Sequence, residues 1–319
     1  MLRSFLIYLS KADWAKRLIT RWNFTWRAAS RFVAGSTVQE AIAVVKELNL
    51  KGINVTLDHL GESTTTRNEA IQATKDIVEL LDQINQSDLR ANVSVKLTQI
   101  GLSLDETLCS QNLEHIISKA GQNGNFVRID MEDSPFTEKT INQYRQIRIK
   151  GYENTGIVIQ SYLFRSEKDL ADLLKDAARV RLVKGAYNEP HNLAFPKKAD
   201  VDSSFDRLTS ELIDGAQAAG SPGLSSDGRI PPIPAIGTHD PRRIQFAREY
   251  AAKAGLPKQS LEFQLLYGIR RDLQNQCLNE GYPVRIYVPY GTHWYPYFMR
   301  RLAERPANVW FFVSNFFRK

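Results

Sequence analysis

Residues 156–184 read GIVIQSYLFRSEKDLADLLKDAARVRLVK: a β-branched run, an amphipathic stretch and a second β-branched run. The runs at 156–162 and 180–184 are typical of buried strands, and the stretch at 166–178 is typical of a helix. A strand, a helix and a strand in this order predict a parallel β/α unit.

The same pattern recurs along the chain. Six further strands are expected, at 53–60, 92–97, 126–131, 234–238, 261–266 and 284–288. The helices expected between them cover 66–85, 104–120, 138–150, 203–219, 241–254 and 270–280. Eight such units predict an α/β fold, a (β/α)8 TIM barrel. The Gly/Ser/Pro-rich loop 219–234 could mark a domain boundary, but the repeat continues through it.

Polar side chains gather where the predicted strands end. They include Asp58, Glu62, Lys96, Asp130, Gln160, Lys184, Thr238, His239, Gln264 and Tyr287. Barrel enzymes carry their active sites at this rim, so the sequence predicts an active site there. For Asp133, Ser134 and Asp240 the alternative is a cap on the helix that follows.

Residues 287–308, YVPYGTHWYPYFMRRLAERPAN, predict a last helix at the barrel mouth, with Pro296 in its first turn and Pro306 at its end. Tyr297, Arg300 and Arg301 share one face of that helix. Paired guanidiniums bind planar anions such as carboxylates. The alternative is a solvated basic face, but the flanking aromatic residues favour a pocket.

The bulk composition narrows the class of protein. The chain is 43% hydrophobic and has two cysteines, Cys109 and Cys277, which fits a reducing compartment. It contains no GxGxxG, GxxxxGK[ST], HExxH or GxSxG motif, and its histidines lack metal spacing. We therefore expect neither a Rossmann site nor a bound metal.

The N-terminus concentrates the positive charge. Residues 1–31 carry seven Lys and Arg against one Asp, together with three tryptophans. Such a segment suits a helix on an anionic membrane surface, and the alternative is a helical hairpin packed on the barrel. Nucleic-acid binding is not expected, because no binding motif accompanies the charge. We expect a basic helical extension over 1–45 and a barrel domain over 46–319.

Several motifs together resemble the proline dehydrogenase family. They are RFVAG (31–35), VTLDHLGE (55–62), SVKLT (94–98), VRIDMED (127–133), GIVIQSYLFRSEKDL (156–170), VRLVKGAY (180–187), GTHD (237–240), EFQLLYGIR (262–270) and the C-terminal run RIYVPYG with WYPYFMRRLAERPAN. The resemblance covers nearly the whole chain and fits the single-function bacterial branch.

The resemblance implies a distorted barrel that binds FAD non-covalently. It implies oxidation of L-proline to Δ1-pyrroline-5-carboxylate, with hydride passing from proline Cδ to flavin N5 and electrons passing to a membrane quinone. A cytoplasmic enzyme is expected, with residues 1–31 in peripheral contact with the inner membrane.

Residue roles also follow from the resemblance. Lys96, Arg300 and Arg301 resemble a carboxylate clamp, and Tyr287, Tyr297 and Leu266 resemble the walls of the proline pocket. Arg181 resembles the arginine near flavin N5, and Asp130 an acid that holds Lys96 or Arg181. The flavin-contacting positions are Met131, Gln160, Arg181, Lys184, Gly185, Ala186, Thr238 and His239. From its position at the end of the first strand, Glu62 is a candidate partner for Arg300 in the empty site, and the alternative is a solvent-exposed acid on the rim.

Three other readings remain open. One is hydroxyproline oxidation, which the Tyr287 phenol would oppose by crowding a ring hydroxyl. Another is a Schiff-base lyase on the same barrel, with Lys96 or Lys184 as the nucleophile. The third is a basic binding protein on an inactive barrel, which the presence of Lys96, Arg181, Arg300 and Arg301 together opposes.

Overall fold

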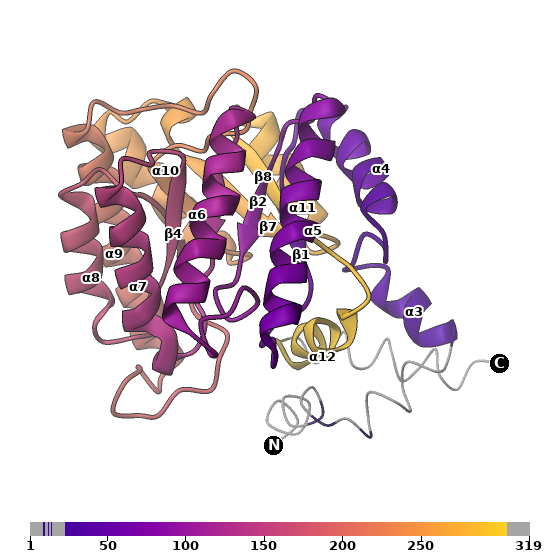
Figure 1. The fold of residues 1–319 in the computed structure, drawn as a ribbon. Coiled ribbons are helices and arrows are strands. Elements are labelled where there is room, and N and C mark those ends of the chain that lie inside the picture. Colours follow the sequence, from indigo (N-terminus) through magenta and orange to yellow (C-terminus); the bar gives the residue numbers. More distant parts are fainter. Residues whose placement is uncertain (1–8, 10–11, 13, 15–22, 305–319) are drawn as a thin grey trace.

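The computed structural model describes residues 9, 12, 14 and 23–304 (Figure 1). Its eight strands are all parallel and pair in chain order, and β8 closes on β1. They are β1 (Asn54–His59), β2 (Ala91–Val95), β3 (Val127–Ile129), β4 (Thr155–Gln160), β5 (Arg179–Val183), β6 (Pro234–Gly237), β7 (Glu262–Leu266) and β8 (Val284–Tyr290). The predicted barrel is confirmed.

Helices surround the barrel, as Figure 1 shows. They are α3 (Asn23–Ala29), α4 (Val38–Asn49), α5 (Arg67–Gln86), α6 (Glu106–Gln122), α7 (Ser134–Ile149), α8 (Ser166–Leu174), α9 (Lys198–Ala218), α10 (Pro241–Ala254), α11 (Arg271–Asn279) and α12 (Trp294–Glu304), with a short 3₁₀ helix, η1 (Lys258–Ser260). Within the described residues, no helix is long and apolar enough to cross a membrane.

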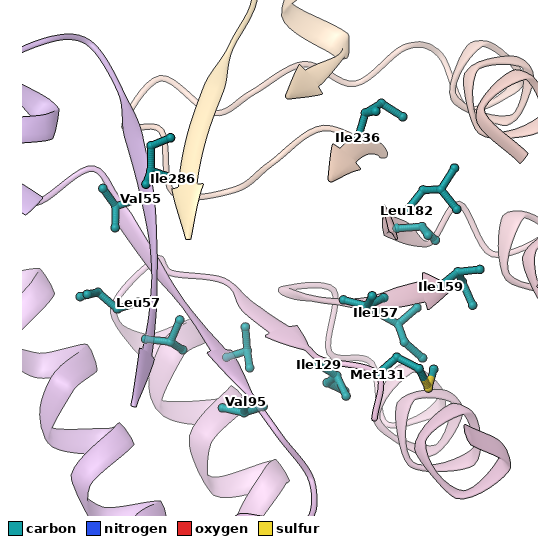
Figure 2. Packing of buried hydrophobic residues seen from close by; sticks show 14 of the residues in the cluster. Val55, Leu57, Val95, Ile129, Met131, Ile157, Ile159, Leu182, Ile236 and Ile286 are labelled. Carbon is teal, nitrogen blue, oxygen red and sulfur yellow. The ribbon is translucent and has the colours of Figure 1, made fainter. Parts of the chain in front are cut away.

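Side chains alternate between the two faces of each strand and divide the barrel into two environments. On β1, β2 and β4 the odd-numbered hydrophobic residues belong to the main core; Figure 2 shows Val55, Leu57, Val95, Ile157 and Ile159 among them. The even-numbered residues therefore point into the barrel, and most of them are polar. Buried charge requires internal pairing, as where Arg285 Nε donates to Glu262 Oε1 at 2.9 Å.

Local sequence fixes where several helices begin. Thr37 and Glu40 form a capping box at α4, and Thr66 and Glu69 form another at α5. Asp240 caps α10 by accepting from Arg242 N, as the sequence suggested, and Pro241 follows at the first helical position.

Three helices differ from the expected bounds by four residues or more at one end. Helix α7 begins four residues earlier than expected, at Ser134 directly after the N-cap residue Asp133. Helix α9 begins five residues early, at Lys198, whose ammonium pairs with Asp202 one turn later. Helix α8 ends at Leu174 instead of 178, because Ala177 has a left-handed backbone with φ of 50°.

The loop 219–234 closes the N-terminal end of the barrel. Arg229 is buried, and its guanidinium donates to Leu89 O at 3.1 Å and to Asn123 O at 3.2 Å. Its own carbonyl accepts from Asn92 Nδ2 at 2.7 Å. Gly228 has φ of 70°, and a Cβ there would meet Asn54 Oδ1 at 2.3 Å. The loop is therefore a structural closure at the end opposite the predicted site.

At the other end, α12 follows β8 and packs on α3. The Trp26 and Trp294 rings meet edge-on at 5.6 Å, and Leu9 and Ala12 pack on the same cluster. Most of residues 1–31, predicted to contact a membrane, and Pro306, predicted to end the last helix, lie outside the described residues. The division at residue 45 stays a prediction, and it falls within α4.

Candidate active site

A cavity of about 570 Å³ opens at the C-terminal ends of the strands. Its lining contains every residue predicted for the site: Lys96, Asp130, Met131, Gln160, Arg181, Lys184, Gly185, Ala186, Thr238, His239, Leu266, Tyr287, Tyr297, Arg300 and Arg301. Because these residues come from seven different strands or strand ends and from α12, closure of the barrel is what brings them together.

Lys96 is the centre of a buried charge cluster. Its Nζ lies 2.9 Å from both carboxylate oxygens of Asp58, 3.3 Å from the Tyr287 hydroxyl, 3.8 Å from Asp130 and 3.9 Å from Glu62. Burial alone would lower the pKa of the Lys96 ammonium, but the three carboxylates outweigh burial and raise that pKa above its ordinary value. Lys96 is therefore a cation at the cavity wall.

Asp130 links Arg181 to the same cluster. Its Oδ1 accepts from Arg181 Nη1 at 2.9 Å and from Ser94 Oγ at 2.5 Å. Its Oδ2 accepts from the Tyr287 hydroxyl at 2.7 Å. Burial first, and then the nearby carboxylates, raise the pKa of the Tyr287 phenol well above its ordinary value, so the phenol stays protonated. The carboxylate thus fixes both a guanidinium and a phenol.

Helix α12 reaches across the mouth and pairs with the loop after β1. Arg300 Nη2 donates to Glu62 Oε1 at 2.5 Å, which confirms the predicted pairing. Burial would raise the pKa of Glu62, but Arg300 and Lys96 hold it below its ordinary value. Arg301 lies beside this pair, with its guanidinium 5.1 Å from the centre of the Tyr297 ring.

Lys184 and His239 line the opposite wall. Lys184 Nζ lies 2.5 Å from Asp202 and 2.7 Å from Asp240. His239 Nε2 accepts from Leu266 N at 2.9 Å, which places the proton of a neutral ring on Nδ1.

Gly185 and Gln160 complete this wall. Gly185 has φ of 113°, and a Cβ there would come within 2.5 Å of the Tyr162 ring. The close approach of Tyr162 is thus a further reason for a glycine at this position. Among the described residues, the buried Gln160 Oε1 has no hydrogen-bond partner. It faces the cavity, so a molecule bound there could donate a hydrogen bond to it.

Asp58 and Gln264 are among the polar residues at the predicted strand ends, and the sequence predicts no role for either. Asp58 is the nearest partner of Lys96, and Gln264 accepts from Arg181 Nε. The sequence signal is alternation with hydrophobic neighbours that belong to the main core, Leu57 before Asp58 and Phe263 and Leu265 around Gln264, which places both polar residues inside the barrel. Pairing with a particular cation depends on the register between strands, which the sequence does not show.

The chain is similar to known proteins in sequence and in fold. The model of the family described as proline dehydrogenase matches residues 41–313. Proline dehydrogenase 2 of Bacillus subtilis (strain 168) is 36% identical over 318 residues, which cover 99% of each chain. Proline dehydrogenase 1 of the same organism is 38% identical over 320 residues, which cover 100% of each.

The fold is also similar to that of a longer solved protein. The crystal structure of proline utilization A (PutA) from Bdellovibrio bacteriovorus inactivated by N-propargylglycine matches with a TM-score of 0.79 and 25% identity. The match covers 88% of this chain and 33% of that chain.

Proposed function

This chain belongs to the proline dehydrogenase family, and from that premise we propose an FAD-dependent oxidation of L-proline to Δ1-pyrroline-5-carboxylate with a membrane quinone as electron acceptor. Proline oxidation in proline catabolism follows from the family. The observation that supports the finer proposal is that one cavity is lined both by a group of cations and by a fixed arginine. Lys96, Arg300 and Arg301 line it near Glu62, and Arg181 is fixed by Asp130.

The lining fits a flavin that is held without a covalent bond. Gln160 Oε1 is a buried acceptor that lacks a donor among the described residues, and a flavin ring carries such a donor. Arg181 and Lys184 add positive charge to the lining. When bound, FAD would supply an electron-poor ring that accepts hydride at N5. Arg181 would stabilise the negative charge that then develops.

The clamp would fix the substrate by its carboxylate. Three cations around one carboxylate set the pose of the ring and supply much of the binding. Arg300 is bonded to Glu62, so substrate would have to replace that partner. The ring nitrogen must be neutral to form the C=N bond, and a cationic clamp favours loss of its proton by like-charge repulsion.

Two alternatives lose support. Tyr287 is fixed by its bond to Asp130, so its phenol cannot easily move aside for the hydroxyl of hydroxyproline. A Schiff-base nucleophile must be a neutral amine, but the carboxylates raise the pKa of Lys96 and keep it charged. Lys184 is paired with Asp202 and Asp240.

The visible spectrum of the purified protein tests the proposal. We expect a yellow protein that L-proline bleaches without oxygen and that trans-4-hydroxyproline bleaches poorly. A protein that stays colourless when FAD is added would overturn the flavin proposal. A yellow protein that L-proline cannot bleach would overturn the assignment of L-proline as the substrate.

The location and domain division are part of the same proposal. We propose a cytoplasmic enzyme in which 46–319 form the FAD-binding catalytic domain and 1–45 a basic extension. Residues 1–31 would contact the inner membrane, because their lysines, arginines and tryptophans suit an anionic surface. A variant that lacks 1–31 should bind vesicles more weakly than the whole chain.

A further inference from the structure

Ser63, the residue directly after Glu62, has a left-handed backbone conformation. Its φ is 58°, which is unfavourable for a residue with a side chain and persists only where neighbouring groups hold it. The Ser63 side chain is exposed, so its own packing does not explain the conformation. Because Glu62 precedes this turn, the turn sets the direction in which Glu62 extends toward Arg300.

Thr98, in the loop after β2, is the residue that holds the Ser63 turn. Its hydroxyl oxygen accepts from Ser63 N at 3.3 Å. Its carbonyl oxygen accepts from Thr64 N at 3.3 Å and from Thr64 Oγ1 at 3.0 Å. The loop that carries Glu62 is therefore tied to the loop after β2 through one residue.

Glu132, in the loop after β3, fixes Thr98 in turn. Its Oε1 accepts from Thr98 N at 3.0 Å and its Oε2 accepts from Thr98 Oγ1 at 2.5 Å. Because the hydroxyl proton is directed at the carboxylate, the lone pairs of Oγ1 are left to accept from Ser63 N. Both residues are buried, and neither is among the described residues that line the cavity. They can therefore affect a bound molecule by charge or through residues that do line it.

We propose that Glu132 and Thr98 are positioning residues that hold Glu62, through the Ser63 turn, where it pairs with Arg300. Glu62 competes with a substrate carboxylate for Arg300, so the two buried residues set the affinity for L-proline without contacting it. Glu62 also lies 3.9 Å from Lys96 Nζ, so a displaced Glu62 would leave a second clamp cation more available. The effect on L-proline rests on the proposed function, and the positioning of Glu62 does not.

The alternative is that Glu132 acts by its charge alone. Its carboxylate interacts electrostatically with Glu62 and Lys96, so removal of the charge would itself favour an anion in the clamp. The two mechanisms differ in what Thr98 contributes. Loss of the Thr98 hydroxyl weakens the hold on Ser63 but changes no charge.

Anaerobic stopped-flow reduction of the flavin-loaded full chain by L-proline tests the proposal. Its dependence on concentration gives the Kd of L-proline separately from the limiting rate of reduction. The solution is kept at about pH 8, where Glu132 is mainly ionised, because burial raises its pKa to about 7. We expect Thr98→Val and Glu132→Gln each to lower the Kd about threefold without lowering the limiting rate or the flavin content. Thr98→Ser, which keeps the hydroxyl, should keep the Kd of the unmodified protein.

Both substitutions are then repeated in a Glu62→Gln background, where no carboxylate remains to be positioned. Neither Thr98→Val nor Glu132→Gln should lower the Kd further there. If Glu132 acted by its charge alone, Glu132→Gln would lower the Kd equally in both backgrounds, and Thr98→Val would have no effect in either. A role in stability alone would leave the Kd unchanged throughout. Either of these two results would overturn the proposal.

Thr155→Val is the matched control. Thr155 is also buried, and its Oγ1 donates to Val127 O at 3.2 Å, but it begins β4 at the end of the barrel opposite the cavity. Its replacement should leave the Kd of L-proline unchanged. A decrease as large as that of Thr98→Val would mean that loss of any buried hydroxyl has this effect, and would overturn the proposal.

Two further outcomes are separable. If Thr98→Val cannot hold flavin, Glu132→Gln supports or overturns the proposal by the same comparison between the two Glu62 backgrounds. Flavin-loaded unmodified protein that L-proline does not reduce would overturn the proposed function and the effect on L-proline with it. Reduction of every variant, with Kd values that do not depend on Glu62, would overturn the positioning role alone.

Discussion

Arg300 on the last helix and Glu62 after the first strand form an ion pair across the mouth of the barrel, with Nη2 and Oε1 2.5 Å apart. The pair joins two parts of the chain that are 238 residues apart in sequence. It also occupies the guanidinium that the proposed substrate would need. Substrate binding and opening of this ion pair are therefore coupled.

Replacing Glu62 with Gln should change substrate release more than flavin binding. With no carboxylate to compete for Arg300, proline should bind roughly threefold to tenfold more tightly and leave more slowly. Stopped-flow flavin reduction and flavin content would measure the two effects. The control is Glu153→Gln, an exposed partner of Arg148 far from the site. Equal flavin loss with unchanged kinetics would contradict the prediction.

Replacing Asp58 with Asn should destabilise the protein. Lys96 would keep only the more distant carboxylates of Asp130 and Glu62, and an undercompensated buried ammonium costs on the order of 3 kcal/mol. Unfolding in guanidinium chloride would measure the decrease in the free energy of unfolding. Adding Lys96→Met should restore part of the stability, because no buried ammonium remains. A double variant no more stable than Asp58→Asn would contradict this account.

Glu132 should make stability depend on pH. Its carboxylate accepts from Thr98 N at 3.0 Å and from Thr98 Oγ1 at 2.5 Å, and burial raises its pKa from 4.5 to about 7. The folded state thus holds a proton that the unfolded state has released. Its contribution to the free energy of unfolding is full below about pH 4.5 and is lost as the pH rises through about 7, a change on the order of 3 kcal/mol.

The Glu132→Gln variant tests this dependence, because Gln resembles the protonated acid. Urea unfolding at intervals from about pH 5 to about pH 8 should show the variant gaining stability relative to the unmodified protein as the pH rises. Parallel curves for the two proteins would show that Glu132 does not titrate in this range.

Replacing Gly185 with Ala should combine backbone strain with a collision. The new Cβ would lie 2.5 Å from the Tyr162 ring at a φ of 113°. Gly151 also has a positive φ, 90°, but nothing lies within 4 Å of its Cβ position. Gly151→Ala should therefore cost about 1 kcal/mol from strain alone, and Gly185→Ala about 2 kcal/mol more. Thermal unfolding of both variants would separate the two terms.

The sequence predicted the barrel because the hydrophobic residues of its strands and helices recur with clear periods. The predicted site residues were also correct in one respect, since all of them line one cavity. The sequence could not predict which residues pair with each other when they lie far apart along the chain. The partner of Lys96 is set by how β1 and β2 align, where Asp58 lies beside Ser94. The early start of α9 has a partly local reason, because Lys198 pairs with Asp202 one turn later, and Asp202 is in turn bonded to Lys184 of a distant loop.

The closure formed by Arg229 affects how the chain folds while it is being synthesised. Its hydrogen bonds reach residues 106 to 144 positions earlier, including Asn123 and Asn85. During translation the first β/α units leave the ribosome long before residue 229 exists. Until then Asn92 lacks its carbonyl partner, and β1 lacks β8. The N-terminal half should therefore stay dependent on chaperones, or only partly folded, until the second half of the chain has emerged.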